Sequence, residues 1–140
     1  MKTKLTVEES AKLIELGVDP KLASMVSWKQ TEDWARKSVL PNKEHLTLKP
    51  FRPMVMGFER FEVKDVFTRA DILNILPKEI EIEGEKEVLN IVMDNYGALV
   101  GYPKFHEKHG CAFVNPELIN SLNMLLVWCL ENKIIKLKEN

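Results

Sequence analysis

The chain has 140 residues, of which 45% are hydrophobic and 29% are charged, with 20 Lys and Arg against 21 Asp and Glu. Domains of about 100–150 residues bury enough apolar surface to fold without a disulfide or metal staple. One globular domain over residues 1–140 is therefore expected. The formal net charge of −1 excludes a strong overall attraction to nucleic acid or anionic lipid.

The sequence contains no apolar run of the kind that directs secretion or spans a membrane. Its two cysteines, Cys111 and Cys129, lack the C-x-x-C spacing of a redox pair. We therefore expect a cytoplasmic protein with reduced thiols and no membrane association.

Two short helices joined by a tight turn are expected in the first 26 residues. Thr6 begins a capping-box pattern, and Gly17 follows the apolar residues of this first helix, where a left-handed residue would end it. Asp19 and Pro20 have the pattern of an N-cap and a first helical residue, which predicts a second helix directly afterwards.

The segment after this helix pair gives weaker signals. Residues 27–42, with Trp28 and Trp34, are compatible with an extension of the second helix or with an irregular segment. Residues 46–48 alternate like a strand that prolines confine to a sheet edge or a loop, and residues 58–63 are compatible with a second strand.

Two further helices are expected in the second half of the chain. Thr68 and Asp71 match a capping box, and Pro77 ends the apolar run that follows. Asn115 and Pro116 have the pattern of the N-cap and first residue of a long helix, which apolar periodicity continues over four turns.

Strands are expected between these helices. Residues 80–93 and 98–102 flank a turn at residues 95–97, and residues 110–114 are compatible with one more strand. The alternating glutamates of residues 79–87 predict a solvated strand face, with a cation site or a basic partner as the alternative. The fold class is therefore α+β, with a small antiparallel sheet of three to five strands packed against the N-terminal helix pair, a short middle helix and the long C-terminal helix.

His106, His109 and Cys111 offer nitrogen and sulfur donors within six residues. Imidazole and thiolate are good zinc ligands, although a structural site needs a fourth, and Cys111 with either histidine is a candidate nucleophile pair. A solvated loop beside a buried, inert thiol explains the same pattern. We favour that interpretation because nothing in the sequence brings the donors together.

The expected N-terminal helix pair also allows a nucleic-acid-binding hypothesis, which requires Lys21, Lys29 and Arg36 on one exposed face. The first 51 residues hold nine basic and seven acidic side chains, which is a small excess. The electrostatic footprint of a nucleic-acid-binding protein is usually larger, so a packed helical hairpin is favoured.

Three stretches, residues 5–20, 66–80 and 116–132, carry helix caps at Thr6 and Thr68 and an apolar helix face. Their order and spacing resemble a family of small uncharacterised bacterial proteins associated with prophages and other mobile elements. The resemblance covers most of the chain. No activity is known for this family, so the resemblance supplies no catalytic residues.

The leading hypothesis is a non-enzymatic binding or accessory protein of a phage or mobile element, which acts through a protein partner or by self-association and needs no cofactor. The interface candidates are Trp28, Trp34, Ile134 and Ile135, because exposed aromatic and aliphatic groups mark interfaces. The alternatives are a nucleic-acid-binding regulator that uses the N-terminal helices and a metal- or thiol-dependent enzyme centred on Cys111.

Overall fold

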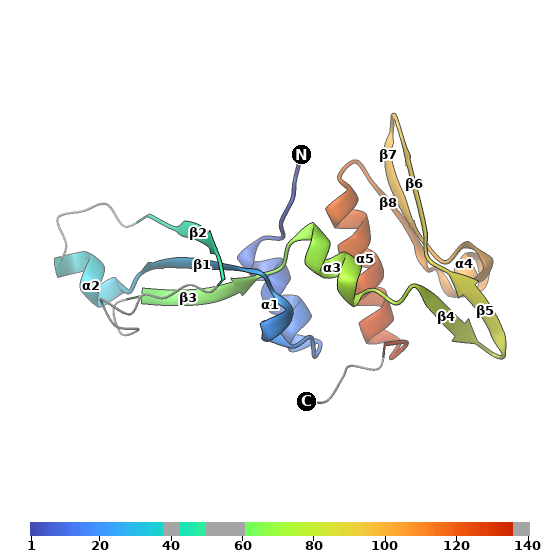
Figure 1. Cartoon of the computed structure of the whole chain (residues 1–140), viewed down its shortest axis with the longest axis horizontal. Helices are drawn as coiled ribbons and strands as arrows, with labels where there is room; N and C mark the ends of the chain where they lie inside the picture. Colours follow the sequence, from blue (N-terminus) through green and yellow to red (C-terminus); the bar gives the residue numbers. More distant parts are fainter. Residues whose placement is uncertain (38–42, 50–60, 136–140) are drawn as a thin grey trace.

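A computed structural model describes residues 1–37, 43–49 and 61–135 (Figure 1). Within them the chain is α+β, with two three-stranded sheets on opposite sides of a group of helices (Figure 1). The helices between the sheets are α1 (Val7–Glu15), α3 (Arg69–Ile75) and the long C-terminal α5 (Leu118–Glu131). The α+β class and the long C-terminal helix are thus confirmed.

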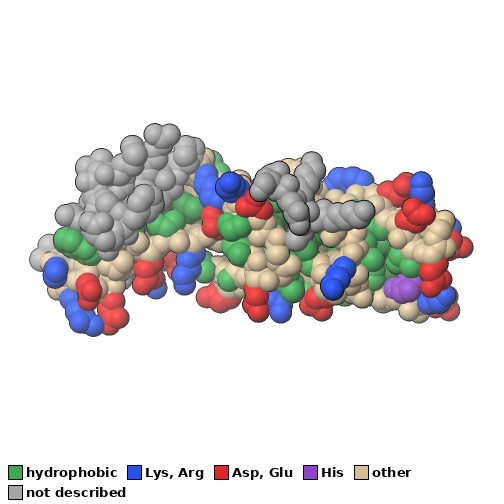
Figure 2. Space-filling view, turned by 90° about the horizontal axis from the view of Figure 1, so that it is seen from below, with side chains coloured by type: hydrophobic (Ala, Val, Ile, Leu, Met, Phe, Trp, Pro, Cys, Tyr) green, Lys and Arg blue, Asp and Glu red, His purple; other side chains and the backbone are tan. Residues whose placement is uncertain are grey.

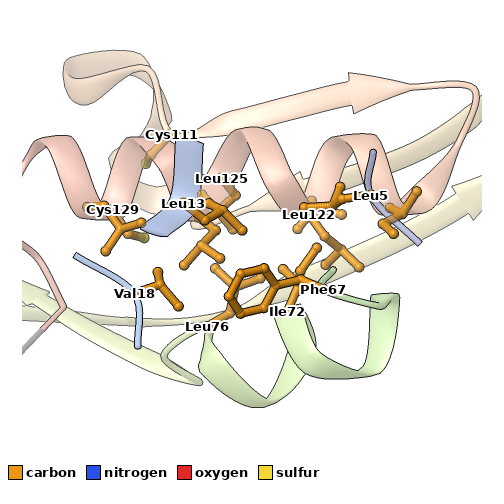
Figure 3. Packing of buried hydrophobic residues seen from close by; sticks show 14 of the residues in the cluster. Leu5, Leu13, Val18, Phe67, Ile72, Leu76, Cys111, Leu122, Leu125 and Cys129 are labelled. Atoms are coloured by element: carbon orange, nitrogen blue, oxygen red, sulfur yellow. The ribbon is translucent and has the colours of Figure 1, made fainter. Parts of the chain in front are cut away.

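The apolar faces of these helices form the core of the molecule. Leu13, Ile72 and Leu125 come from α1, α3 and α5 and are fully buried together with Phe67 (Figure 3). Ser10 and Ser121 are buried among them, and each is satisfied by the backbone: Ser10 Oγ accepts from the Phe67 N–H at 3.1 Å, and Ser121 Oγ donates to the Ala98 carbonyl at 2.7 Å. The core is therefore apolar, with its few hydroxyl groups hydrogen-bonded.

The first sheet has a central strand with an antiparallel neighbour on each side. Its strands are β1 (Met25–Gln30), β2 (His45–Leu48) and β3 (Phe61–Val66), in the order β2-β1-β3. The short helix α2 (Glu32–Lys37) follows β1. Parts of the segments expected at residues 27–42 and 58–63 lie outside the described residues.

The second half of the chain forms one separate hairpin and a three-stranded antiparallel sheet in the order β6-β7-β8. These elements are β4 (Glu79–Ile82), β5 (Glu85–Val88), β6 (Asn90–Asp94), β7 (Gly97–Gly101), α4 (Pro103–His109) and β8 (Ala112–Asn115). Helix α5 packs on β7 and β8. The strands therefore form three small sheets, where the sequence predicted one.

Both expected capping boxes are confirmed. Thr6 Oγ1 accepts from the Glu9 N–H at 3.1 Å, and the Glu9 carboxylate accepts from the Thr6 N–H at 3.0 Å. Thr68 and Asp71 form the same reciprocal pair at the start of α3. The predicted start of the C-terminal helix was wrong by two residues: Asn115 ends β8, Glu117 is the N-cap, and α5 begins at Leu118. The Asn115 side chain still accepts from the Glu117 N–H, at 3.0 Å, in the turn before the helix.

The prediction of a second N-terminal helix was wrong after its first turn. Asp19 does accept from the Lys21 N–H, but the helical segment is a single 3₁₀ turn, η1 (Pro20–Leu22), and a strand begins at Met25. The physical reason is a contact far along the chain. The Ser24 backbone N–H donates to the Asp71 carboxylate, whereas in a continuing helix it would donate to a carbonyl of the same helix.

The structure also tests the predictions for residues 103–109 and for the acidic β4–β5 hairpin. Residues 103–109 form helix α4, with Pro103 at its start and the left-handed Gly110 at its end, where a polar loop was expected. The acidic hairpin has the expected alternation at its first strand, because Ile80 is buried while Glu79 and Glu81 are exposed.

Candidate functional site

His106, His109 and Cys111 do not converge. His106 Nδ1 accepts from the Ala112 N–H at 3.1 Å, and the carbonyl of His109 accepts from the Trp128 indole N–H at 3.1 Å. Cys111 is buried and its thiol donates to the Tyr102 carbonyl at 3.4 Å. Over residues 1–37, 43–49 and 61–135 no group of three His, Cys, Asp or Glu side chains is placed to hold a metal ion.

The thiols are held in their protonated form. Burial raises the pKa of the Cys111 thiol, and it raises the pKa of Cys129 from 9.0 to about 12. Burial also raises the pKa of Tyr102, whose hydroxyl donates to the Pro77 carbonyl at 2.6 Å. Because the thiolate is the nucleophilic form, neither cysteine is activated at neutral pH.

Lys21, Lys29 and Arg36 lie on three different elements. Lys21 is in η1, Lys29 is on β1 with Glu62 3.9 Å away, and Arg36 is on α2, paired with Glu32 at 2.6 Å. Acidic and basic side chains are interspersed over the described part of the face in Figure 2. The helix face that the nucleic-acid hypothesis requires does not form in the described residues.

The four interface candidates from the sequence make contacts within the chain. Trp28 is half-buried, stacked on His45 at a centroid distance of 4.3 Å and edge-on to Phe61 at 5.3 Å. Trp34 lies under the Lys37 ammonium, which is 5.2 Å from its ring centroid. Ile134 and Ile135, beyond the end of α5, are partly buried against the core.

A cavity of about 650 Å³ lies between residues 1–8 and the first sheet. Lysines and glutamates both line it, and two of the glutamates already have partners: Glu44 accepts from Ser27 Oγ at 2.5 Å, and Glu62 pairs with Lys29. The charges in the cavity are mixed, so its lining selects no single class of ligand.

Exposed apolar side chains gather instead on the second three-stranded sheet and on β5, which precedes it in the chain. Nine large hydrophobic residues among the described ones are well exposed, and six of them lie on β5, β6, β8 and the β6–β7 turn. We call these six the apolar surface: Val88, Ile91, Val92, Met93, Tyr96 and Val114. The exposed fractions reach 54% for Val92, 60% for Val114 and 86% for Tyr96.

The strand register explains why these side chains are exposed. Val92 lies opposite Leu99, and Leu99 lies opposite Val114, so the three side chains form a row on one face of the sheet. On the face toward α5, Ile91 lies opposite Val100, which is fully buried. Helix α5 packs on β7 and β8, so the side chains of β6 extend past its cover.

The backbone of β6 is also open on one side. Among the described strands, β6 pairs with β7 alone and forms the edge of its sheet. The tip of the β6–β7 hairpin reaches past the end of α5 (Figure 1). Edge strands usually carry a lysine, a proline or a bulge that discourages pairing, but Asp94 is the only ionisable residue of β6, at its end.

The sequence contains one signal of this surface. The segment from Ile91 to Met93 is a continuous apolar run, whereas a strand with one solvated face alternates. A continuous run is typical of burial on both faces, so residue type alone does not predict exposure here. That β6 is an edge strand could be learned only from the strand order.

Comparisons with models of protein families, with curated proteins and with solved structures gave no match. Within the described ranges, none of the helices has the length and apolar content needed to cross a membrane. The candidate site therefore depends on the geometry of the chain alone.

Proposed function

We propose that this protein is a binding or accessory protein that engages a protein partner through the apolar surface. The observation that carries the proposal is that six of the nine large hydrophobic side chains exposed in the described residues lie on β5, β6, β8 and the β6–β7 turn. Apolar groups of this size cost free energy in water, and contiguous ones mark interaction sites.

The open edge of β6 adds a second kind of contact. Backbone N–H and C=O groups of an edge strand that face away from its neighbour can pair with an added strand. Such pairing supplies affinity through the main chain, while the side chains on each face supply specificity. The row of Val92, Leu99 and Val114 would extend directly onto such a strand.

The resemblance to prophage- and mobile-element-associated proteins belongs to the same proposal. An accessory protein that acts by binding needs an exposed contact surface, and the apolar surface supplies one. The alternatives, a nucleic-acid-binding regulator and a metal- or thiol-dependent enzyme, have no contact that favours them in residues 1–37, 43–49 or 61–135.

The proposal is tested with a photo-crosslinking amino acid at position 92 and, as a control, at position 48. Leu48 is similarly exposed but lies on β2, in the other sheet. In a lysate of the cells that encode the protein, position 92 should give a protein adduct that excess wild-type chain suppresses. A Val92→Lys chain should fail to suppress it. Equal adducts at both positions, or suppression by Val92→Lys, would overturn the proposal.

A further inference from the structure

The edge strand β6 is complementary to itself, which identifies a specific partner for the apolar surface. We infer that this partner is a second copy of the chain, with the two β6 strands paired antiparallel around a two-fold axis at Val92. The inference rests on the proposed function, because it names the occupant of the same surface. It predicts a continuous six-stranded sheet, β8-β7-β6-β6-β7-β8.

The register centred on Val92 matches like with like. It places Val92 opposite Val92 of the second copy, and Ile91 opposite Met93. All of these side chains are exposed in the single chain. The same antiparallel register brings Tyr96, at the hairpin tip, toward Val88 of the second copy. Five of the six residues of the apolar surface therefore lie along the boundary between the two copies.

Charges at the ends of the strand are compatible with this register. Asp94, the only ionisable residue of β6, comes opposite Asn90 of the second copy. Asp94 Oδ1 accepts from the N–H groups of Tyr96 and Gly97, and its Oδ2 has no partner in the described part of the chain. Asn90 uses its Nδ2 once, toward the Val88 carbonyl, and that amide nitrogen has a second hydrogen to donate.

Shifting the register removes this complementarity. If the axis moved to Met93, the Asp94 carboxylate would lie opposite Val92 of the second copy. That arrangement places a charge against an apolar side chain and offers the Asp94 Oδ2 no amide donor from the second copy, which is unfavourable. The register centred on Val92 therefore matches charge and apolarity better than the register centred on Met93.

Sheet geometry extends the match to the faces. Residues directly opposite each other in an antiparallel pair point to the same face. The row of Val92, Leu99 and Val114 in one copy therefore continues into the same row of the other. An interface made by one strand edge is small, so the dimer is expected to be weak and to depend on concentration.

The test is the oligomeric state, measured by sedimentation over a series of concentrations. Wild type should move from monomer to dimer as concentration rises. Val92→Lys and Val92→Glu should each weaken dimerisation by roughly tenfold or more, because each places like charges together at the axis. An equimolar mixture of the two variants should restore a dimer that contains one chain of each, since Lys and Glu then face one another. Leu48→Lys should dimerise like wild type.

Restoration in the mixture separates an interface from a folding defect, because two damaged chains would not repair each other. A wild-type chain that stays monomeric throughout, or a mixture that stays monomeric while wild type dimerises, would overturn the inference. The photo-crosslinking experiment distinguishes the two proposals. A suppressible adduct at position 92 with a different protein, together with a monomeric wild type, would leave the proposed function standing and reject self-pairing.

Discussion

The Asp71 carboxylate joins the helical core to the first sheet. Its Oδ2 accepts from the Ser24 N–H at 2.8 Å, from Ser24 Oγ at 2.8 Å and from the Thr68 N–H at 2.9 Å. Only 9% of the residue is exposed. Asp71→Ala removes all three bonds and leaves the partly buried N–H groups of Ser24 and Thr68 without this acceptor. At about 1 kcal/mol net for each bond, the expected loss in free energy of unfolding is about 3 kcal/mol.

Two variants control this prediction. Asp71→Asn keeps an acceptor oxygen of the same size but loses the charge, so we expect about half of the loss. Glu9→Ala removes the corresponding residue of the other capping box, which is more exposed and should cost only about 1 kcal/mol. Urea unfolding followed by circular dichroism measures all three. A loss for Asp71→Ala no larger than that for Glu9→Ala would refute the assignment of Asp71 as the link to Ser24.

Three further variants test other features of the fold. The folded chain keeps the Cys129 proton up to a pKa of about 12, whereas the unfolded thiol loses it near 9.0. The stability that comes from keeping this thiol protonated is therefore complete below pH 9.0 and is lost as the pH rises toward 12. The urea midpoint should decline over this pH range, and Cys129→Ala should make that decline shallower. Glu83 has a φ of 52° beside Gly84 at 82° in the turn between β4 and β5, so Glu83→Asn should raise the free energy of unfolding by about 0.5–1 kcal/mol. A Cβ at Gly101 would lie 2.4 Å from the Cys111 carbonyl oxygen, so Gly101→Ala should lower stability by roughly 3 kcal/mol, measured by thermal unfolding.

The features that the sequence predicted correctly depend on neighbouring residues. The capping boxes at Thr6 and Thr68 form because each needs only residues within one helical turn. The turn at residues 95–97 forms for a similar reason, because the Asp94 side chain accepts from two backbone N–H groups directly after it.

The features that it missed depend on residues far apart in the chain. Asp19 and Pro20 begin a helical turn as expected, but Ser24 then bonds to Asp71, 47 residues away. After that contact β1 can pair on both sides, and Trp28 packs between His45 and Phe61. These cross-strand contacts contribute more free energy than the local preference for helix, which is small for each residue.

The interface candidates predicted from the sequence do not include the apolar surface, for a related reason. Trp28 and Trp34 are interface candidates by residue type alone. An aromatic side chain in a small sheet buries most apolar area by packing on its neighbours, as Trp28 does on His45 and Phe61. Whether the side chains of β6 are exposed depends on how much of the sheet α5 covers. The hydrophobic periodicity of α5 and β6 in the sequence does not predict that coverage. The glutamates of the β4–β5 hairpin keep its surface solvated, whereas β6 has no such protection along Ile91, Val92 and Met93. An unprotected edge favours pairing with another strand, so the difference between these two neighbouring hairpins is itself an argument that β6 is kept open for a partner.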